Sequence, residues 1–193
     1  MAAAAALRTE FGRLGAYAAD SGWRETKLNH AFALCPTYPQ VLLVPAACSD
    51  DVVREVAEFR SKQRLPALSW LNARTGAAIV RCAQPLVGVL GRKSEADEQL
   101  FQFIAQANPA NQSIAMVDAR PYLNALVNRG RAGGFEDMSR YEESQASLAF
   151  LGVENIHEMR ESLAAMHALG RSFAPKEIGG AVEVVTLTDV HVT

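Results

Sequence analysis

The chain has 193 residues, of which 49% are hydrophobic and 21% charged, and its formal net charge at pH 7 is −2. This length suits one ordinary α/β domain or part of a larger one, and the composition is that of a soluble globular protein. The near balance of charge argues against a nucleic-acid-binding domain, which would carry a strong basic field.

The compartment is predicted from the first residues and the cysteines. Met1–Leu7 is apolar but too short for a signal-peptide core or a membrane span. Cys35, Cys48 and Cys82 are odd in number and show no CxxC spacing, so we interpret them as reduced thiols. We therefore expect a cytoplasmic protein, with no disulfide framework, no metal site and no cofactor.

The first half of the chain predicts alternating helices and strands. Ala2–Leu14 is alanine-rich and suits a short helix, and the segments 22–33 and 40–44 suit an edge strand with its loop and an apolar strand. Ser49 suits a helix N-cap before an apolar face that contains Val53 and Val56. Residues 67–71 and 77–82 flank a loop that ends at Gly76, which is typical of a β-hairpin.

The second half continues the alternation. Ser94 suits the N-cap of a helix that Asn108-Pro109 ends. Ile114–Val117 and Leu148–Val153 are apolar runs that predict strands, each followed by a helix, and the second helix is expected to end near Leu169 with Gly170 as its C-cap. Residues 173–180 suit a loop, and 182–193 alternate like a terminal strand.

Two strand-to-helix junctions organise the chain between residues 113 and 162. Asp118 and Arg120 follow the first of these strands, and Asn155 and His157 follow the second. We expect the two strands to be adjacent, with these polar groups at their carboxyl ends. Ligands of open α/β sheets bind at the carboxyl ends of the strands, so these polar groups mark the predicted functional edge. We expect one domain, without internal repeats.

Eight phrases, taken together and in this order, give the chain a family resemblance: Trp23–Arg24, Cys35–Pro39, Phe59–Pro66, Leu68–Trp70, Arg81–Pro85, Asp97–Leu100, Val117–Pro121 and Asn155–Ser162. The chain resembles the myotubularin family of phosphoinositide 3-phosphatases over about residues 10 to 165. The resemblance implies an α/β fold, a partial protein-tyrosine-phosphatase-like domain with a mixed central sheet flanked by helices. It places the amino-terminal half of that domain at 10–170 and a divergent tail at 171–193.

The resemblance also implies a further domain, a catalytic loop and a set of pocket residues. Family members begin with a PH-GRAM domain and carry a catalytic loop of the type His-Cys-Ser-Asp-Gly-Trp-Asp-Arg, and neither is found in these 193 residues. By resemblance, Asn128, Asn155 and Ile156 match positions that line the inositol phosphate pocket. Asn155 also suits a helix N-cap, and Asn128 a helix end before Gly130.

One stretch satisfies the bare Cys-x5-Arg spacing of a cysteine-dependent phosphatase, from Cys48 to Arg54. The loop has no glycine that would let its amides turn toward a phosphate, and Val52 and Val53 already belong to the next helix. We favour the interpretation that Cys48 is a small loop residue and Arg54 a solvated helix residue.

Other polar residues have both a structural and a functional interpretation. Asp118 and Arg120 suit a structural salt bridge better than a reactive pair, and a lone His157 in a first helical turn is more often structural than catalytic. Six basic residues are candidates for contact with anionic lipid headgroups, although a solvated surface is the default interpretation: Arg60, Lys62, Arg64, Arg74, Arg92 and Lys93.

Two functions of different classes follow. The first is a fragment of a phosphatase for the 3-phosphate of phosphatidylinositol 3-phosphate and 3,5-bisphosphate, inactive as it stands because it lacks the catalytic loop, with the lipid headgroup as ligand of the complete enzyme. The second is a catalytically dead interaction module that pairs with an active myotubularin homologue through an unfinished sheet. A phosphatase that uses Cys48 is a third, weaker option. We expect at most peripheral membrane association, on endosomal membranes, and no nucleic-acid partner.

Overall fold

The computed structural model describes residues 2–172, of which 2–152 belong to one compact unit and 153–172 to a second. The boundary at Gly152 lies within the stretch 10–170 that we expected to form one domain. The predicted loop 173–180 and terminal strand 182–193 lie outside the described residues. Each unit is described by itself.

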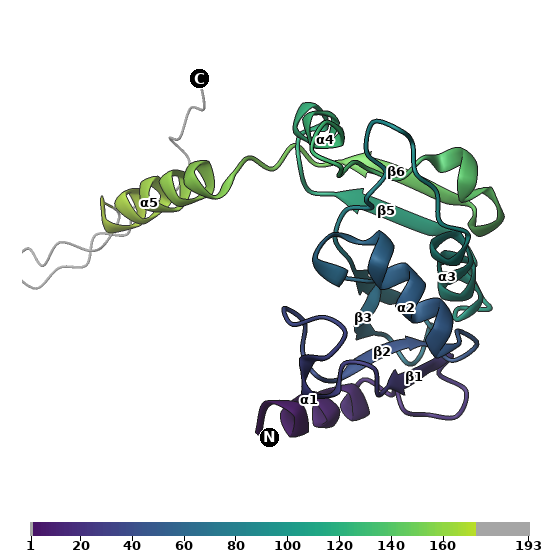
Figure 1. The fold of residues 1–193 in the computed structure, drawn as a ribbon. Coiled ribbons are helices and arrows are strands. Elements are labelled where there is room, and N and C mark those ends of the chain that lie inside the picture. The colour runs from purple at the N-terminus through teal and green to yellow at the C-terminus, as the bar shows by residue number, and fades with distance from the viewer. Residues whose placement is uncertain (1, 173–193) are drawn as a thin grey trace, which may run out of the picture. The chain divides into compact units, whose positions relative to one another are not determined.

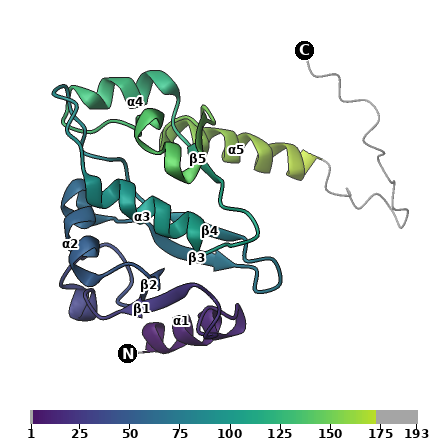
Figure 2. The ribbon, with the colours of Figure 1, turned by 90° about the vertical axis from the view of Figure 1, so that its right-hand side faces the viewer.

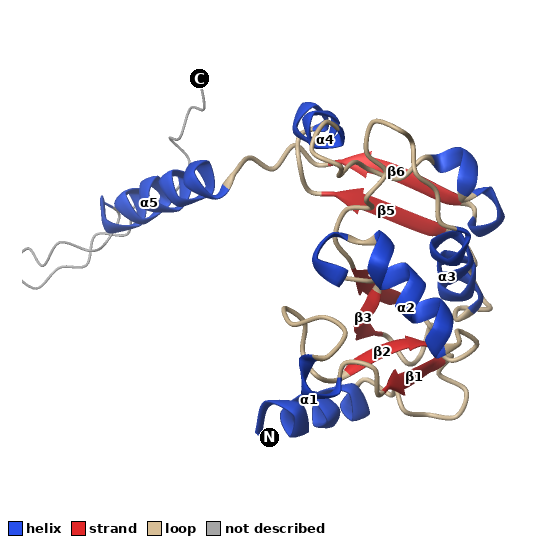
Figure 3. Ribbon diagram, in the orientation of Figure 1, coloured by secondary structure: helices blue, strands red, loops and turns tan. Residues whose placement is uncertain are grey.

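The described residues alternate between helices and strands, which confirms the predicted α/β class (Figure 1, Figure 3). The elements in chain order are α1 (Ala2–Arg13), β1 (Trp23–Thr26), β2 (Leu42–Pro45), α2 (Asp50–Phe59), β3 (Ala67–Leu71), β4 (Ala78–Arg81), α3 (Glu95–Gln106), β5 (Ile114–Asp118), α4 (Tyr122–Arg129), β6 (Ala146–Phe150) and α5 (Ile156–Ser172). Short 3-10 turns lie at residues 30–32, 61–63, 138–140 and 142–144.

The strands form three separate pairs in place of one continuous central sheet. Strands β1 and β2 are antiparallel, β3 and β4 form the predicted antiparallel hairpin, and β5 and β6 are parallel. Gly76 closes the hairpin loop with a φ of 71°, a left-handed conformation that glycine adopts without strain.

The core explains why the first strands and helices lie where they do. Leu42 and Val44 of β2 pack with the apolar faces of α2 and α3, whereas Leu43 packs with α1, β1 and β3. Successive side chains of a strand point to opposite faces, so β2 is buried on both sides. Figure 2 shows α2 and α3 on one side of β2 and α1 on the other.

The two predicted N-caps of this unit are confirmed. The Ser49 hydroxyl accepts a hydrogen bond from the Val52 N–H, and the Ser94 hydroxyl accepts one from the Asp97 N–H. Each cap satisfies a backbone donor that the first helical turn leaves without an acceptor. Acidic residues also follow both caps, where the helix dipole favours negative charge.

The predicted pairing of the two organising strands is confirmed, with a shift in the second one. Strand β6 covers 146–150 and so begins two residues earlier than the predicted run of 148–153, because its five residues pair in register with all five of β5. Gly152, with a φ of 67°, ends the extended backbone before Val153. Three aromatic rings then hold α4 to the end of β6: Tyr122, Phe135 and Phe150 lie with centroids 5.2–5.7 Å apart.

Helix α5 forms the described part of the second unit. The Asn155 side-chain oxygen accepts hydrogen bonds from the His157 and Glu158 N–H groups, so its predicted role as N-cap is confirmed. The predicted end at Gly170 is wrong, because the helix continues to Ser172. Glycine adopts right-handed helical angles at a cost of about 1 kcal/mol relative to alanine, too little by itself to end a helix.

Candidate functional site

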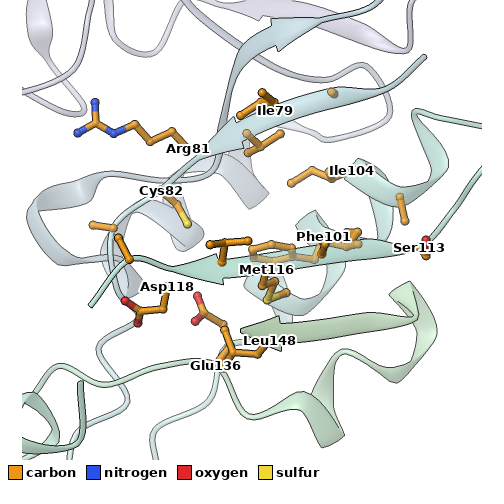
Figure 4. Close-up of a pocket in the computed structure, with 18 of the residues that line it drawn as sticks. Ile79, Arg81, Cys82, Phe101, Ile104, Ser113, Met116, Asp118, Glu136 and Leu148 are labelled. Carbon is orange, nitrogen blue, oxygen red and sulfur yellow. The ribbon is translucent and has the colours of Figure 1, made fainter. Parts of the chain in front are cut away.

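A cavity of about 810 Å³ lies between β4 and β5 in the first unit, and we call it the β4–β5 cavity. Its apolar part is lined by Ile79 of β4, Phe101 and Ile104 of α3, and Met116 of β5. Figure 4 shows these side chains along the two strands and α3, with Cys82, Asp118 and Glu136 toward the carboxyl ends of the strands. Of the predicted functional edge, Asp118 and Arg120 therefore line one end of this cavity, whereas Asn155 and His157 belong to the second unit.

Arg120 organises the polar end of the β4–β5 cavity. Its guanidinium pairs with the Asp118 carboxylate at 2.6 Å and donates to the Gln84 side-chain oxygen and to the Gly134 carbonyl oxygen at 2.9 Å. Burial alone would raise the pKa of Asp118, but the hydrogen bonds from Arg120 lower it overall. The predicted structural salt bridge is confirmed, and it joins three loops.

A glycine pair allows one of those loops to approach closely. A Cβ atom on Gly133 would lie 2.7 Å from the Gln84 amide nitrogen, which no ordinary contact permits. The Gly134 N–H donates to the same Gln84 oxygen at 3.4 Å. The Gly133-Gly134-Phe135-Glu136 turn thus brings Glu136 to the cavity wall because its first residue has no side chain.

A fully buried arginine lies beneath this wall. Arg60 has no exposed surface, and its guanidinium donates twice to Asp97, which is equally buried, and also pairs with Glu136. The Tyr141 hydroxyl donates to Asp97 at 2.8 Å, and the Phe101 ring lies 5.2 Å from the guanidinium carbon. This network connects four segments of the chain at the base of the cavity.

Cys82 is the cysteine that lines the cavity, 3.7 Å from an Arg60 nitrogen. Solvent reaches the residue through the cavity, but the surrounding protein displaces bulk water from its thiol. This desolvation, opposed by Arg60, raises the pKa of Cys82 to about 11. At neutral pH the group is a thiol, which is a poor nucleophile. Within residues 2–172, no three side chains of His, Cys, Asp or Glu gather to hold a metal ion.

The Cys48–Arg54 stretch has the structural role that we favoured. Cys48 is buried, and burial raises the pKa of its thiol to about 11. Arg54 lies on the exposed face of α2 and pairs with Asp51 at 2.6 Å. The two side chains do not form an anion-binding loop, because the helix begins at Asp50 and carries Arg54 away. Cys35 is fully buried and donates to the Lys62 carbonyl oxygen.

The three predicted substrate-binding residues belong to different units. Asn128 lies on α4 and lines the β4–β5 cavity, and its side chain makes no hydrogen bond within residues 2–172. Asn155 caps α5, and Ile156 begins that helix with its side chain exposed. Their common role around one inositol phosphate stays a prediction. His157 lies in the first turn of α5.

The predicted basic surface needs one correction. Arg60 is completely buried in the ion network, so it is not available to lipid headgroups. Arg64 is half-buried and donates to the Thr37 hydroxyl, whereas four of the six residues are exposed: Lys62, Arg74, Arg92 and Lys93. In the part of the chain that the structure covers, no helix is long and apolar enough to cross a bilayer.

Comparison with known proteins identifies this scaffold. The family model described as "myotubularin-like phosphatase domain" matches residues 2–179. The chain belongs to the myotubularin-like phosphatase family. It is 45% identical over 144 residues to phosphatidylinositol-3,5-bisphosphate 3-phosphatase MTMR2 of Pongo abelii, which covers 75% of this chain and 22% of the relative.

Two further relatives of the family give the same picture. Myotubularin of Rattus norvegicus is 46% identical over 144 residues, 75% of this chain and 24% of the relative. Myotubularin of Xenopus laevis is 43% identical over 155 residues, 80% of this chain and 25% of the relative. The chain thus spans about a quarter or less of the length of these curated relatives.

Sequence reasoning missed Gln84, Glu136 and Cys82 as members of the cavity. Cys82 and Gln84 belong to the family phrase Arg81–Pro85, and Glu136 belongs to the glycine turn at 133–136, but nothing in the local pattern says that these segments meet. Their contacts join residues 22 to 76 positions apart. A myotubularin-like phosphatase sequence therefore carries its site in loops that only the fold brings together.

Proposed function

We propose that this chain forms one wall of the substrate pocket of a phosphoinositide 3-phosphatase that acts on phosphatidylinositol 3-phosphate and 3,5-bisphosphate. The observation that carries the proposal is the position of Asn128, whose amide makes no hydrogen bond within residues 2–172, in the same cavity as the Arg120–Gln84 cluster at the carboxyl end of β5. The name of the MTMR2 relative, a 3-phosphatase of phosphatidylinositol 3,5-bisphosphate, supports the choice of substrate. Asn155 and Ile156, which belong to the second unit, remain predicted substrate-binding residues by resemblance.

The nucleophile of the proposed reaction does not come from these residues. All three cysteines lie in the described part of the chain; Cys48 and Cys82 have a raised pKa, and Cys35 is fully buried. A cysteine-dependent phosphatase needs a thiolate next to an arginine and a ring of inward backbone N–H groups. The 193 residues alone are therefore expected to be inactive, with the catalytic loop supplied by the remainder of a phosphatase domain.

A hybrid protein tests the proposal. The segment of Pongo abelii MTMR2 that matches this chain is replaced by the corresponding residues of this chain, and phosphate release from phosphatidylinositol 3-phosphate in vesicles is measured. The proposal expects release by the hybrid, release also by its Cys48→Ser variant, and none by the 193-residue chain. A folded hybrid without activity would contradict it, and loss of activity in the Cys48→Ser variant alone would revive Cys48 as nucleophile.

The interaction module remains a second candidate, and it is favoured by the edges of β4 and β5, which pair with no further strand within residues 2–172. In this case the chain associates with an active homologue and adds no chemistry. Co-purification of the chain with full-length MTMR2, without any change in the hydrolysis rate of MTMR2, is the expected result. For either function we propose a cytoplasmic protein that meets endosomal membranes at its periphery, with Lys62, Arg74, Arg92 and Lys93 as the exposed cations.

A further inference from the structure

The loop between β4 and α3 carries the two most exposed large apolar side chains among residues 2–172. Val89 is 83% exposed and Leu90 is 94% exposed. A single exposed apolar side chain is ordinary on a protein surface, but here two neighbours share the tip of one loop. This tip presents nearly all of its apolar surface to water and therefore gains free energy wherever it meets an apolar phase.

The loop is a closed turn with a defined backbone. The Arg92 N–H donates to the Val87 carbonyl oxygen at 2.8 Å and so joins the two sides of the tip. Gly88 and Gly91 turn the chain before and after the two apolar residues, with φ values of 61° and 63° that glycine adopts without strain. Figures 1 and 2 show the loop extending alongside α4. The fold thus holds the apolar tip away from the core.

Two cations follow the apolar tip directly. Arg92 and Lys93 are exposed, and within residues 2–172 neither side chain forms an ion pair or a hydrogen bond. Residues 82–94 contain no aspartate or glutamate, and the next acidic residue, Glu95, begins α3. The loop therefore combines apolar surface with positive charge that no neighbouring carboxylate balances.

The loop is tied to the polar end of the β4–β5 cavity. The Gly88 N–H donates to the Gly133 carbonyl oxygen at 2.8 Å. The Val87 side chain lies 3.3 Å from the place that a Cβ on Gly134 would take, and the Gly134 carbonyl oxygen accepts a hydrogen bond from Arg120. One turn of the chain thus supports both the loop and the proposed substrate pocket.

We propose that Val89 and Leu90 insert into the surface of an anionic lipid bilayer, while Arg92 and Lys93 pair with its headgroups. An apolar tip with cations beside it matches the two layers of such a surface, acyl chains below and phosphates above. The inference deepens the proposed function and rests on it for the choice of a membrane as partner. It assigns the membrane contact to this loop instead of to Lys62 and Arg74.

A second copy of the chain suits the tip less well than a bilayer does. A symmetric contact through Val89 and Leu90 brings the Arg92 and Lys93 side chains of both copies together, and neither loop supplies an acidic residue. Two side chains also bury far less area than a stable protein interface needs. A bilayer requires no complementary groove, because its lipids adapt to the inserted side chains.

Sedimentation with vesicles tests the loop. The full chain is mixed with vesicles of phosphatidylcholine and phosphatidylserine, which hold no phosphoinositide, so the proposed pocket does not contribute. We expect Leu90→Ser to weaken binding about fivefold and the double variant Arg92→Gln/Lys93→Gln about tenfold. Ile79→Ser in the cavity and Arg74→Gln in the β3–β4 hairpin loop are the matched controls, and both should bind like the unchanged chain.

Insertion itself is measured with the Leu90→Trp variant. We expect lipids with brominated acyl chains to quench its fluorescence more than that of the unchanged chain, whose Trp23 and Trp70 lie in other segments. Equal quenching would show adsorption by charge alone and overturn the insertion. The inference also fails if anionic vesicles bind no chain, if Leu90→Ser and Ile79→Ser bind equally, or if the chain self-associates through a contact that Leu90→Ser abolishes.

Hydrolysis by the hybrid with MTMR2 separates this inference from the proposed function. Leu90→Ser is expected to lower phosphate release from phosphatidylinositol 3-phosphate in vesicles and to leave release from a water-soluble, short-chain form unchanged. Equal loss on both substrates would contradict a membrane role for Leu90. A hybrid that binds vesicles through the loop but releases phosphate from neither substrate would refute the proposed function alone.

Discussion

Removal of the Asp97 carboxylate is expected to destabilise the first unit severely. Arg60 and Asp97 are both without exposed surface, joined by two hydrogen bonds, and Tyr141 donates to the same carboxylate. The Asp97→Ala change leaves the buried guanidinium with Glu136 as its one carboxylate partner among residues 2–172, and it leaves the Tyr141 hydroxyl without its acceptor. Loss of one partner of a buried pair costs about 3–5 kcal/mol, because the remaining charge stays out of water.

Urea unfolding followed by tryptophan fluorescence measures this loss, since Trp23 and Trp70 both lie in the first unit. With a slope of about 2 kcal/mol per M, the midpoint falls by roughly 2 M. The double variant Arg60→Met/Asp97→Leu removes both fully buried charges together and is expected to recover more than half of the shift.

A surface ion pair is the control for that prediction. Glu10 pairs with Arg13 at 2.6 Å, but both side chains are largely exposed, so Glu10→Gln is expected to leave the urea midpoint unchanged. If Asp97→Ala moves the midpoint no further than Glu10→Gln does, the buried network does not hold the base of the cavity together, and the reasoning is refuted.

Three smaller perturbations test other parts of the structure. Ser94→Ala should cost about 1 kcal/mol in urea unfolding because it removes an N-cap acceptor, and Ser94→Asp should not. Gly133→Ala should displace the Gln84 amide from Arg120 and cost about 1 kcal/mol; a neutral result would mean that the turn yields freely. Folding lowers the pKa of Asp118, so its carboxylate stabilises the folded state fully above its unfolded pKa of about 3.9. This contribution is lost as the pH falls through the folded pKa. The urea midpoint of the Asp118→Asn variant should therefore fall less than that of the unchanged chain over this acid range.

The predictable parts of this fold are those that local chemistry decides. Ser49, Ser94 and Asn155 cap their helices as expected, because an N-cap needs only a side-chain oxygen and the next three residues. Gly76 closes its hairpin for an equally local reason. The parallel pairing of β5 with β6 followed from two apolar runs with helices between and after them.

The predictions that failed concern features that depend on residues far apart in the chain. Arg60 belongs to a basic cluster in the sequence, a pattern that is typical of a solvated surface. Its burial is explained only by its contacts with Asp97 and Glu136, which are 37 and 76 positions away in the chain. The start of β6 depends on the register of β5, not on its own apolar run. Ile79 and Val117 suit strands locally, but only the fold shows that their strands face one cavity.

Phosphate release by the hybrid with a changed Asn128 tests the proposed substrate pocket most directly. The steady-state kcat/KM for phosphatidylinositol 3-phosphate is compared for the hybrid and its Asn128→Ala and Asn124→Ala variants. Asn124 is the matched control, because it lies on the same helix but does not line the cavity.

A hydrogen bond to a charged ligand contributes about 1.5–3 kcal/mol, so we expect Asn128→Ala to lower kcat/KM roughly ten- to hundredfold. Asn124→Ala should retain the value of the hybrid. Equal activity of the two variants in folded proteins would contradict a substrate pocket at the carboxyl end of β5.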